Sequence, residues 1–156
     1  MKATETTYET LLVDEVKPGI VVVTLNRPDR FNAMTDTMFI ELEQLAWALD
    51  AEDEIRVMIL TGAGKSFCAG YDRAARALSA IRGLHVPVIA AVNGPAAGGG
   101  FSLALQADIR LAGPEAKFNA AFVRIGLSAG DLGTSWLLTR LIGPAHTSEI
   151  CFTGRI

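Results

Sequence analysis

Three consecutive glycines, Gly98 to Gly100, open the helical pattern GGGFSLALQAD (98–108) directly after a strand-like run that ends in Asn93-Gly94-Pro95. Glycine is a poor helix former, so its repetition at this place needs a reason. One reason is chemical. The first N–H groups of a helix lack partners within the helix and favour negative charge, so bare backbone here suits a phosphate or a developing oxyanion. The other reason is close packing of the helix on its neighbours, for which small residues also serve.

Two phosphate-binding motifs each fail at one position. TGAGKS (61–66) resembles the end of a P-loop, but that motif requires a glycine where the chain has Ile59. The dinucleotide fingerprint requires a third glycine where the chain has Leu103. The sequence therefore predicts neither a nucleoside-triphosphatase nor a Rossmann site.

Strands and helices alternate along the chain around this glycine turn. Apolar runs predict strands at 19–28, 56–60, 86–92 and 108–112, and helical spacing predicts helices at 35–49, up to Arg82, from the glycine triplet and at 134–143. Thr35 is a candidate cap for the first helix, and Gly143-Pro144 marks the end of the last one. The alternation predicts an α/β fold with buried strands.

Four separated segments resemble, in order, the crotonase superfamily of enoyl-CoA hydratases and isomerases. They are LNRPDRFNAM (25–34), ILTGAGKSFCAGYD (59–72), PVIAAVNGPAAGGGFSLALQADIRLA (87–112) and RIGLSAGDLGTSWLLTRLIG (124–143). The resemblance runs from about Gly19 to the last residue. It implies a spiral of repeated ββα units that binds an acyl-CoA and grips its thioester oxygen with two backbone N–H groups.

The resemblance assigns these two catalytic donors to Tyr71 and Gly99. It also implies that the path of coenzyme A is lined by Arg27, Arg30, Asn32, Ala33, Lys65, Ala69, Gly70 and Asp72. The three basic residues in this set are candidates for meeting phosphates, and solvated surface charge explains each of them equally well. Coenzyme A enters as part of the substrate, and no separate cofactor and no metal ion is implied.

The chain departs from typical hydratases at both catalytic glutamates, whose positions hold Ser102 and Phe122. Hydration of an enoyl thioester needs one group that activates water and one that protonates the α-carbon, so isomerase-type proton transfer is favoured over classical hydration. Asp131 in GLSAGDLGTSW is the remaining carboxylate. It resembles a working aspartate of some superfamily members and would act as acid/base or nucleophile, while capping of the following helix is an equal alternative.

Composition limits the binding partners, the location and the cysteine chemistry that we expect. Half of the residues are apolar, a fifth are charged and the formal net charge is −3, which argues against general binding to nucleic acid or anionic membranes. No apolar run is long enough to span a bilayer, and MKATETTYET lacks the apolar core of a signal peptide, so we expect a cytoplasmic location. Cys68 and Cys151 are too few for a disulfide framework, and we expect reduced, partly buried thiols.

We expect residues 1–156 to form a single acyl-CoA-binding domain that is short between 72 and 87 and ends early. The family's C-terminal trimerisation helices are absent from the chain, so a homotrimer or a dimer of trimers is expected if a full-length chain carries them. The favoured hypothesis is an enzyme of the enoyl-CoA hydratase/isomerase family acting through a thioester enolate. The alternative is a non-catalytic acyl-CoA-binding or assembly protein on the same scaffold.

Overall fold

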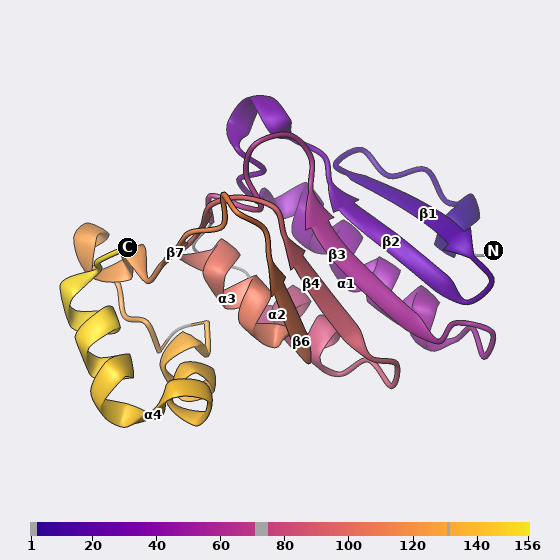
Figure 1. The fold of residues 1–156 in the computed structure, drawn as a ribbon. Coiled ribbons are helices and arrows are strands. Elements are labelled where there is room, and N and C mark those ends of the chain that lie inside the picture. The colour runs from indigo at the N-terminus through magenta and orange to yellow at the C-terminus, as the bar shows by residue number, and fades with distance from the viewer. Residues whose placement is uncertain (1–2, 71–74, 131) are drawn as a thin grey trace.

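The computed structural model describes residues 3–70, 75–130 and 132–156, and its centre is a five-stranded sheet (Figure 1). The strand order is β1-β2-β3-β4-β6. In chain order these strands are β1 (Leu11–Lys17), β2 (Ile20–Leu25), β3 (Val57–Gly62), β4 (Val88–Val92) and β6 (Ile109–Ala112). All neighbouring pairs are parallel except β1 and β2.

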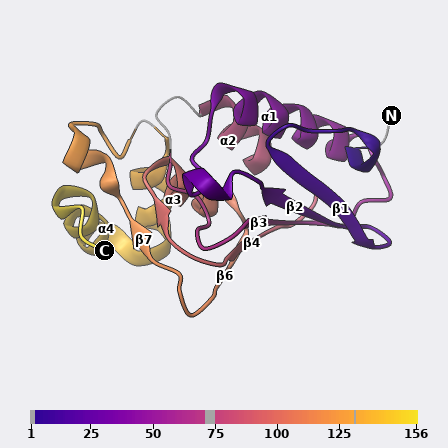
Figure 2. The same cartoon turned by 90° about the horizontal axis from the view of Figure 1, so that it is seen from above.

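Helices lie on one face of this sheet, and the C-terminal elements lie beside it (Figures 1 and 2). Helices α1 (Asp36–Asp50) and α2 (Ala75–Arg82) cover one face of it, and α3 (Gly99–Gln106) lies between α2 and α4 (Thr134–Thr153) (Figures 1 and 2). A small parallel pair joins β5 (Ala96–Ala97) to β7 (Phe118–Asn119). Three 3₁₀ helices complete the described chain: η1 (Ala3–Glu5), η2 (Pro28–Arg30) and η3 (Ala121–Ile125). The predicted α/β class is confirmed.

Buried and partly exposed residues alternate along β2, β3 and β4, and the buried side chains lie on the face that the helices cover. In β2, Val21, Val23 and Leu25 are completely buried, while the residues between them are partly exposed, and β3 and β4 follow the same alternation. On β6, Ile109 and Leu111 are about half exposed. The prediction of buried strands therefore holds for the helix-covered face and is wrong for the opposite face.

Strand β1 was not expected from the sequence. Of its seven residues only Leu11 is buried, so the alternation that identifies a half-buried strand is missing. It pairs antiparallel with β2, with a register shift between Glu15 and Lys17. An edge strand of this kind is held by its backbone hydrogen bonds to β2 rather than by a buried face. Its sequence therefore lacks the apolar alternation from which a strand is predicted.

Two local predictions about helix ends are confirmed. The Thr35 side chain accepts a hydrogen bond from the Met38 N–H, at 3.3 Å, at the start of α1. Within α4, Gly143 has φ 81° and ψ 165° and interrupts the helix just before Pro144. The segment 134–142 is thus a separate helical arm that begins next to α3.

Parallel pairing of β3 and β4 places the segments that follow them side by side. Asn93, at the end of β4, accepts a hydrogen bond from Gly62 N–H at 3.2 Å and donates one to Gly64 O at 3.0 Å. Further along, Cys68 forms a parallel bridge with Ala96. These contacts therefore place the loop after β3 next to the start of α3.

Candidate active site

The glycines at the start of α3 allow two backbones to touch. A Cβ on Gly100 would lie 2.1 Å from the carbonyl oxygen of Cys68, and a Cβ on Gly70 would lie 2.5 Å from the oxygen of Ala97 and 3.1 Å from the nitrogen of Gly99. No side chain fits at either position without moving the backbone. Close packing is therefore one physical reason for the glycines.

The start of α3 also presents a backbone donor. Gly98 has φ 49° and ψ −119°, a conformation that favours glycine. Its N–H donates to Asn119 O at 2.9 Å, and the helix ladder begins with Ser102 N–H donating to Gly98 O at 2.9 Å. Within the part of the chain that the structure describes, the Gly99 N–H has no acceptor. A free donor at a helix start is suited to bind an oxyanion.

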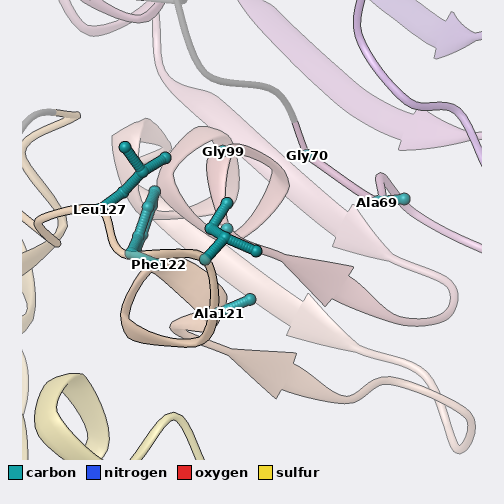
Figure 3. Close-up of a pocket in the computed structure, with 8 residues that line it drawn as sticks. Ala69, Gly70, Gly99, Ala121, Phe122 and Leu127 are labelled. Carbon is teal, nitrogen blue, oxygen red and sulfur yellow. The ribbon is translucent and has the colours of Figure 1, made fainter.

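An open pocket of about 260 Å³ lies against this donor (Figure 3). Residues 69–70 and 98–99 contribute backbone and small side chains, and the ring of Phe122 and the side chain of Leu127 stand beside the Gly99 end of α3. The lining residues are Ala69, Gly70, Gly98, Gly99, Ala121, Phe122, Ile125 and Leu127. None of these described residues can titrate, so the pocket itself offers an apolar wall and a backbone dipole.

Sequence reasoning did not assign Ile125 or Leu127 to this wall. Both follow from the local fold, because η3 places Phe122 and Ile125 nearly one turn apart and Leu127 N–H donates to Phe122 O at 2.9 Å. The spacing of the apolar residues after Phe118 in the sequence could have indicated that these side chains share one apolar surface. It did not show which cavity these residues would meet.

The two positions that the resemblance matches to the hydratase glutamates hold Ser102 and Phe122, neither of which is an acid or a base. Ser102 is completely buried, and its hydroxyl contacts Gly98 O at 3.2 Å and the Thr134 hydroxyl at 2.5 Å. Phe122 is 3% exposed, with its ring edge 4.0 Å from a Cβ built on Gly98. Ser102 is thus held by the protein and does not line the pocket.

Asn32, one of the predicted coenzyme A contacts, is completely buried with φ 54°. Its amide nitrogen donates to Ala63 O and to Ser66 O, both at 2.8 Å, and its amide oxygen accepts from Arg27 N–H at 2.9 Å. The Arg27 guanidinium donates to Ala33 O. These contacts tie the 27–33 loop to the loop after β3, so the Asn32 side chain is engaged within the protein.

The other predicted coenzyme A residues lie around the same junction. Arg30 and Lys65 are exposed. Ala69 N–H donates to Phe31 O at 3.0 Å, which brings the 27–33 loop to the edge of the pocket that Ala69 and Gly70 line. Tyr71, Asp72 and Asp131 lie outside the described residues, and their roles stay predictions.

The remaining nucleophilic and titratable candidates have structural surroundings. Burial raises the pKa of the Cys68 thiol to about 12, so it is a neutral packing group. The His85 ring contacts Asp50, with Nδ1 at 2.5 Å from Oδ1, on an exposed surface away from the pocket. Among the described residues, no three His, Cys, Asp or Glu side chains form a group that would hold a metal ion.

Comparison with known proteins shows the family to which the chain belongs. The sequence model of the family described as enoyl-CoA hydratase/isomerase matches residues 15–78 and 74–156. The chain belongs to this family. A probable enoyl-CoA hydratase of Mycobacterium leprae is 41% identical over 169 residues, covering 93% of the chain and 58% of the relative. The 1,2-epoxyphenylacetyl-CoA isomerase of Escherichia coli is 37% identical over 164 residues, covering 92% and 62%.

Solved structures of family members show the same fold. A monofunctional enoyl-CoA isomerase from M. smegmatis is 46% identical and matches with a TM-score of 0.86, covering 94% of the chain and 68% of that structure. A Thermobifida fusca YX protein, solved in complex with acetoacetyl-CoA, is 28% identical with a TM-score of 0.85, covering 94% and 67%. The resemblance to the crotonase superfamily and the fold it implied are confirmed.

The chain spans about three fifths of the length of the curated family members it matches. Within the described residues, no helix is long and apolar enough to cross a membrane.

Proposed function

We propose that the protein binds an acyl-CoA thioester with the carbonyl oxygen at the Gly99 end of α3, where the N–H groups of Gly99 and Tyr71 form an oxyanion hole. The observation that carries this proposal is the Gly99 donor, which has no acceptor among the described residues and lines the pocket. Each such donor contributes about 3 kcal/mol to the stabilisation of an enolate-like transition state. The acetoacetyl-CoA complex of the Thermobifida fusca family member supports a thioester ligand.

The proposed reaction is proton transfer between carbons of the acyl chain, as in an enoyl-CoA isomerase. The described walls of the pocket hold no carboxylate, and Ser102 is engaged by Gly98 and Thr134, so no described group is placed to activate water. Two matched family members, from M. smegmatis and Escherichia coli, carry isomerase names. Isomerisation needs one base that returns the proton it removes, and Asp131 is assigned this role.

The coenzyme A moiety is proposed to lie along the junction of the 27–33 loop and the loop after β3. The exposed side chains of Arg30 and Lys65 would meet its phosphates, beside Arg27, Ala33, Ala69, Gly70 and Asp72. Asn32 contributes by holding the two loops together through its three hydrogen bonds. No separate cofactor is part of the proposal.

The experiment that tests this function follows one 3-enoyl-CoA substrate by two readouts, double-bond migration to the 2-enoyl product and formation of the hydrated product. We expect migration without comparable hydration. Asp131→Asn should lower kcat by a factor of about 10² or more with little change in ligand affinity, because it removes the proton-transfer group. Asp53→Asn, at an exposed position away from the pocket, is the matched control.

A second function, acyl-CoA binding without catalysis, is favoured by the lack of any titratable residue among the described pocket walls. The same experiment separates the two functions. Saturable binding of an acyl-CoA with no turnover, or turnover that is unchanged in Asp131→Asn, would overturn the catalytic proposal and leave the binding function. A homotrimer or dimer of trimers remains a prediction, which sedimentation equilibrium tests.

A further inference from the structure

A second cavity of about 280 Å³ lies at the other end of α3 from the proposed thioester pocket. It is lined by residues of α2, the last residue of α3 and residues around the start of α4. Gln106 of this cavity is seven residues after Gly99, which corresponds to about 10 Å along the helix. The lining residues are Leu78, Ser79, Arg82, Gln106, Leu132, Gly133, Trp136 and Leu137.

Gln106 is the polar side chain that distinguishes this cavity. The residue is 7% exposed and lines the cavity, and its amide nitrogen lies 3.9 Å from a Cβ built on Gly133. Within the described residues this nitrogen donates no hydrogen bond. The nitrogen is not among the fully buried polar atoms that lack a partner, so it is accessible from the cavity and can donate to an acceptor on a ligand there.

Positive charge gathers at the same end of α3. The Arg82 guanidinium donates to Gln106 O at 3.2 Å and lies 3.7 Å from an oxygen of Asp108. Arg110 lines the adjoining cavity together with Arg82, and burial followed by the charge of Arg82 lowers the pKa of the Arg110 guanidinium. Arg82 pairs with the Asp108 carboxylate, whereas the Arg110 guanidinium donates to the backbone oxygens of Ala107 and Asp108. Two guanidiniums and one carboxylate therefore lie at this end of α3.

The start of α4 adds to this charge. Gly133 precedes the helix and supplies no side-chain cap, and the arm that begins at Thr134 continues to the break at Gly143. Its N-terminal end carries partial positive charge next to the Gln106 amide. The opposite walls are apolar, from Leu78 and Leu137 among others.

We propose that this cavity binds a carboxylate that carries an aliphatic chain, with the Gln106 amide, the Arg82 guanidinium and the start of α4 around the carboxylate and the leucine side chains around the chain. The inference does not depend on the thioester chemistry at Gly99. Two sources would supply this ligand: a free fatty acid, or an acyl-CoA whose acyl chain ends in a carboxylate.

Calorimetric titration with octanoate, and with octan-1-ol as the uncharged analogue of the same chain, tests the proposal. Octanoate should bind saturably and more tightly than the alcohol. Gln106→Leu, which removes the amide at similar volume, should weaken octanoate binding about tenfold or more, because a hydrogen bond to a charged group is lost. Gln106→Glu should weaken it further through charge repulsion, with little effect on the alcohol. Gln44→Leu, on the exposed surface of α1, is the matched control and should bind like the wild type.

Displacement of octanoate identifies the source of the ligand. If suberoyl-CoA competes and octanoyl-CoA does not, the site takes the distal carboxylate of an acyl chain; if neither competes, it takes free carboxylates. The proposal is overturned if octanoate does not saturate the protein, or if folded Gln106→Leu and Gln106→Glu both bind it as tightly as the wild type. Urea midpoints measured for both variants establish that they are folded.

Discussion

Gly100→Ala tests the close backbone contact that sets the position of the Gly99 N–H. The added methyl would lie 2.1 Å from the oxygen, 2.7 Å from the carbonyl carbon and 2.8 Å from the Cβ of Cys68. Ordinary contacts begin at about 3.5 Å, so the two backbones have to separate by about 1.4 Å. Cys68 cannot retreat freely, because its backbone bridges to Ala96. Overpacking of this kind costs up to about 3 kcal/mol, and alanine's better helix propensity offsets about 1 kcal/mol.

The expected net effect is a loss of about 2 kcal/mol in the free energy of unfolding, measured from the urea midpoint at an unchanged m-value. The affinity for octanoyl-CoA should fall as well, because the Gly99 donor moves with the helix. Gly113→Ala is the matched control, since its added methyl would lie 3.4 Å from the nearest atom, and we expect a change within about 0.5 kcal/mol. A Gly100→Ala protein as stable as the wild type would refute the packing argument.

Three further predictions concern other described contacts. Asn32→Ala removes three buried hydrogen bonds at a left-handed backbone position and should cost about 3 kcal/mol in urea unfolding; a loss below about 1 kcal/mol would contradict the role of Asn32 in joining the two loops. The His85 backbone N–H and then its ring lower the pKa of Asp50 from its ordinary 3.8, so the contact stabilises the fold above that pH and is lost as pH falls through the folded pKa. His85→Ala removes the ring and keeps the N–H, so it should raise this pKa part of the way toward 3.8 in a carboxyl NMR titration. An unchanged value would refute the ring contact. The buried Cys68 thiol, with a pKa of about 12, should resist iodoacetamide at pH 8 until the protein unfolds, and rapid labelling of the folded chain would show that it is accessible.

The parts of the fold that follow local rules were predictable from the sequence. Thr35 caps α1 as expected, and α4 is interrupted at Gly143, just before Pro144. The central strands and the glycine-rich start of α3 were recognisable because apolar runs and turn residues are local signals. The family resemblance then added their arrangement in space.

Contacts between distant segments were not predictable in this way. The Ser102 hydroxyl contacts the Thr134 hydroxyl, although the two residues are 32 positions apart in the sequence. The Asn119 side-chain nitrogen donates to Gly154 O at 2.9 Å, and the Asn119 backbone oxygen accepts from Gly98 N–H. The glycine pattern alone also left two explanations open. The structure shows that Gly100 is required by packing. Gly99 lines the pocket with an N–H that has no acceptor among the described residues, and its role as an oxyanion donor stays a prediction.

The central claim is that a thioester oxygen accepts a hydrogen bond at the Gly99 end of α3. Difference infrared spectroscopy of octanoyl-CoA, with ¹³C at the thioester carbonyl to identify its band, measures this directly. The account predicts that the carbonyl stretch of the bound ligand moves to lower frequency, because donors in the pocket polarise the C=O bond. A saturably bound thioester whose carbonyl frequency equals that in water would contradict it.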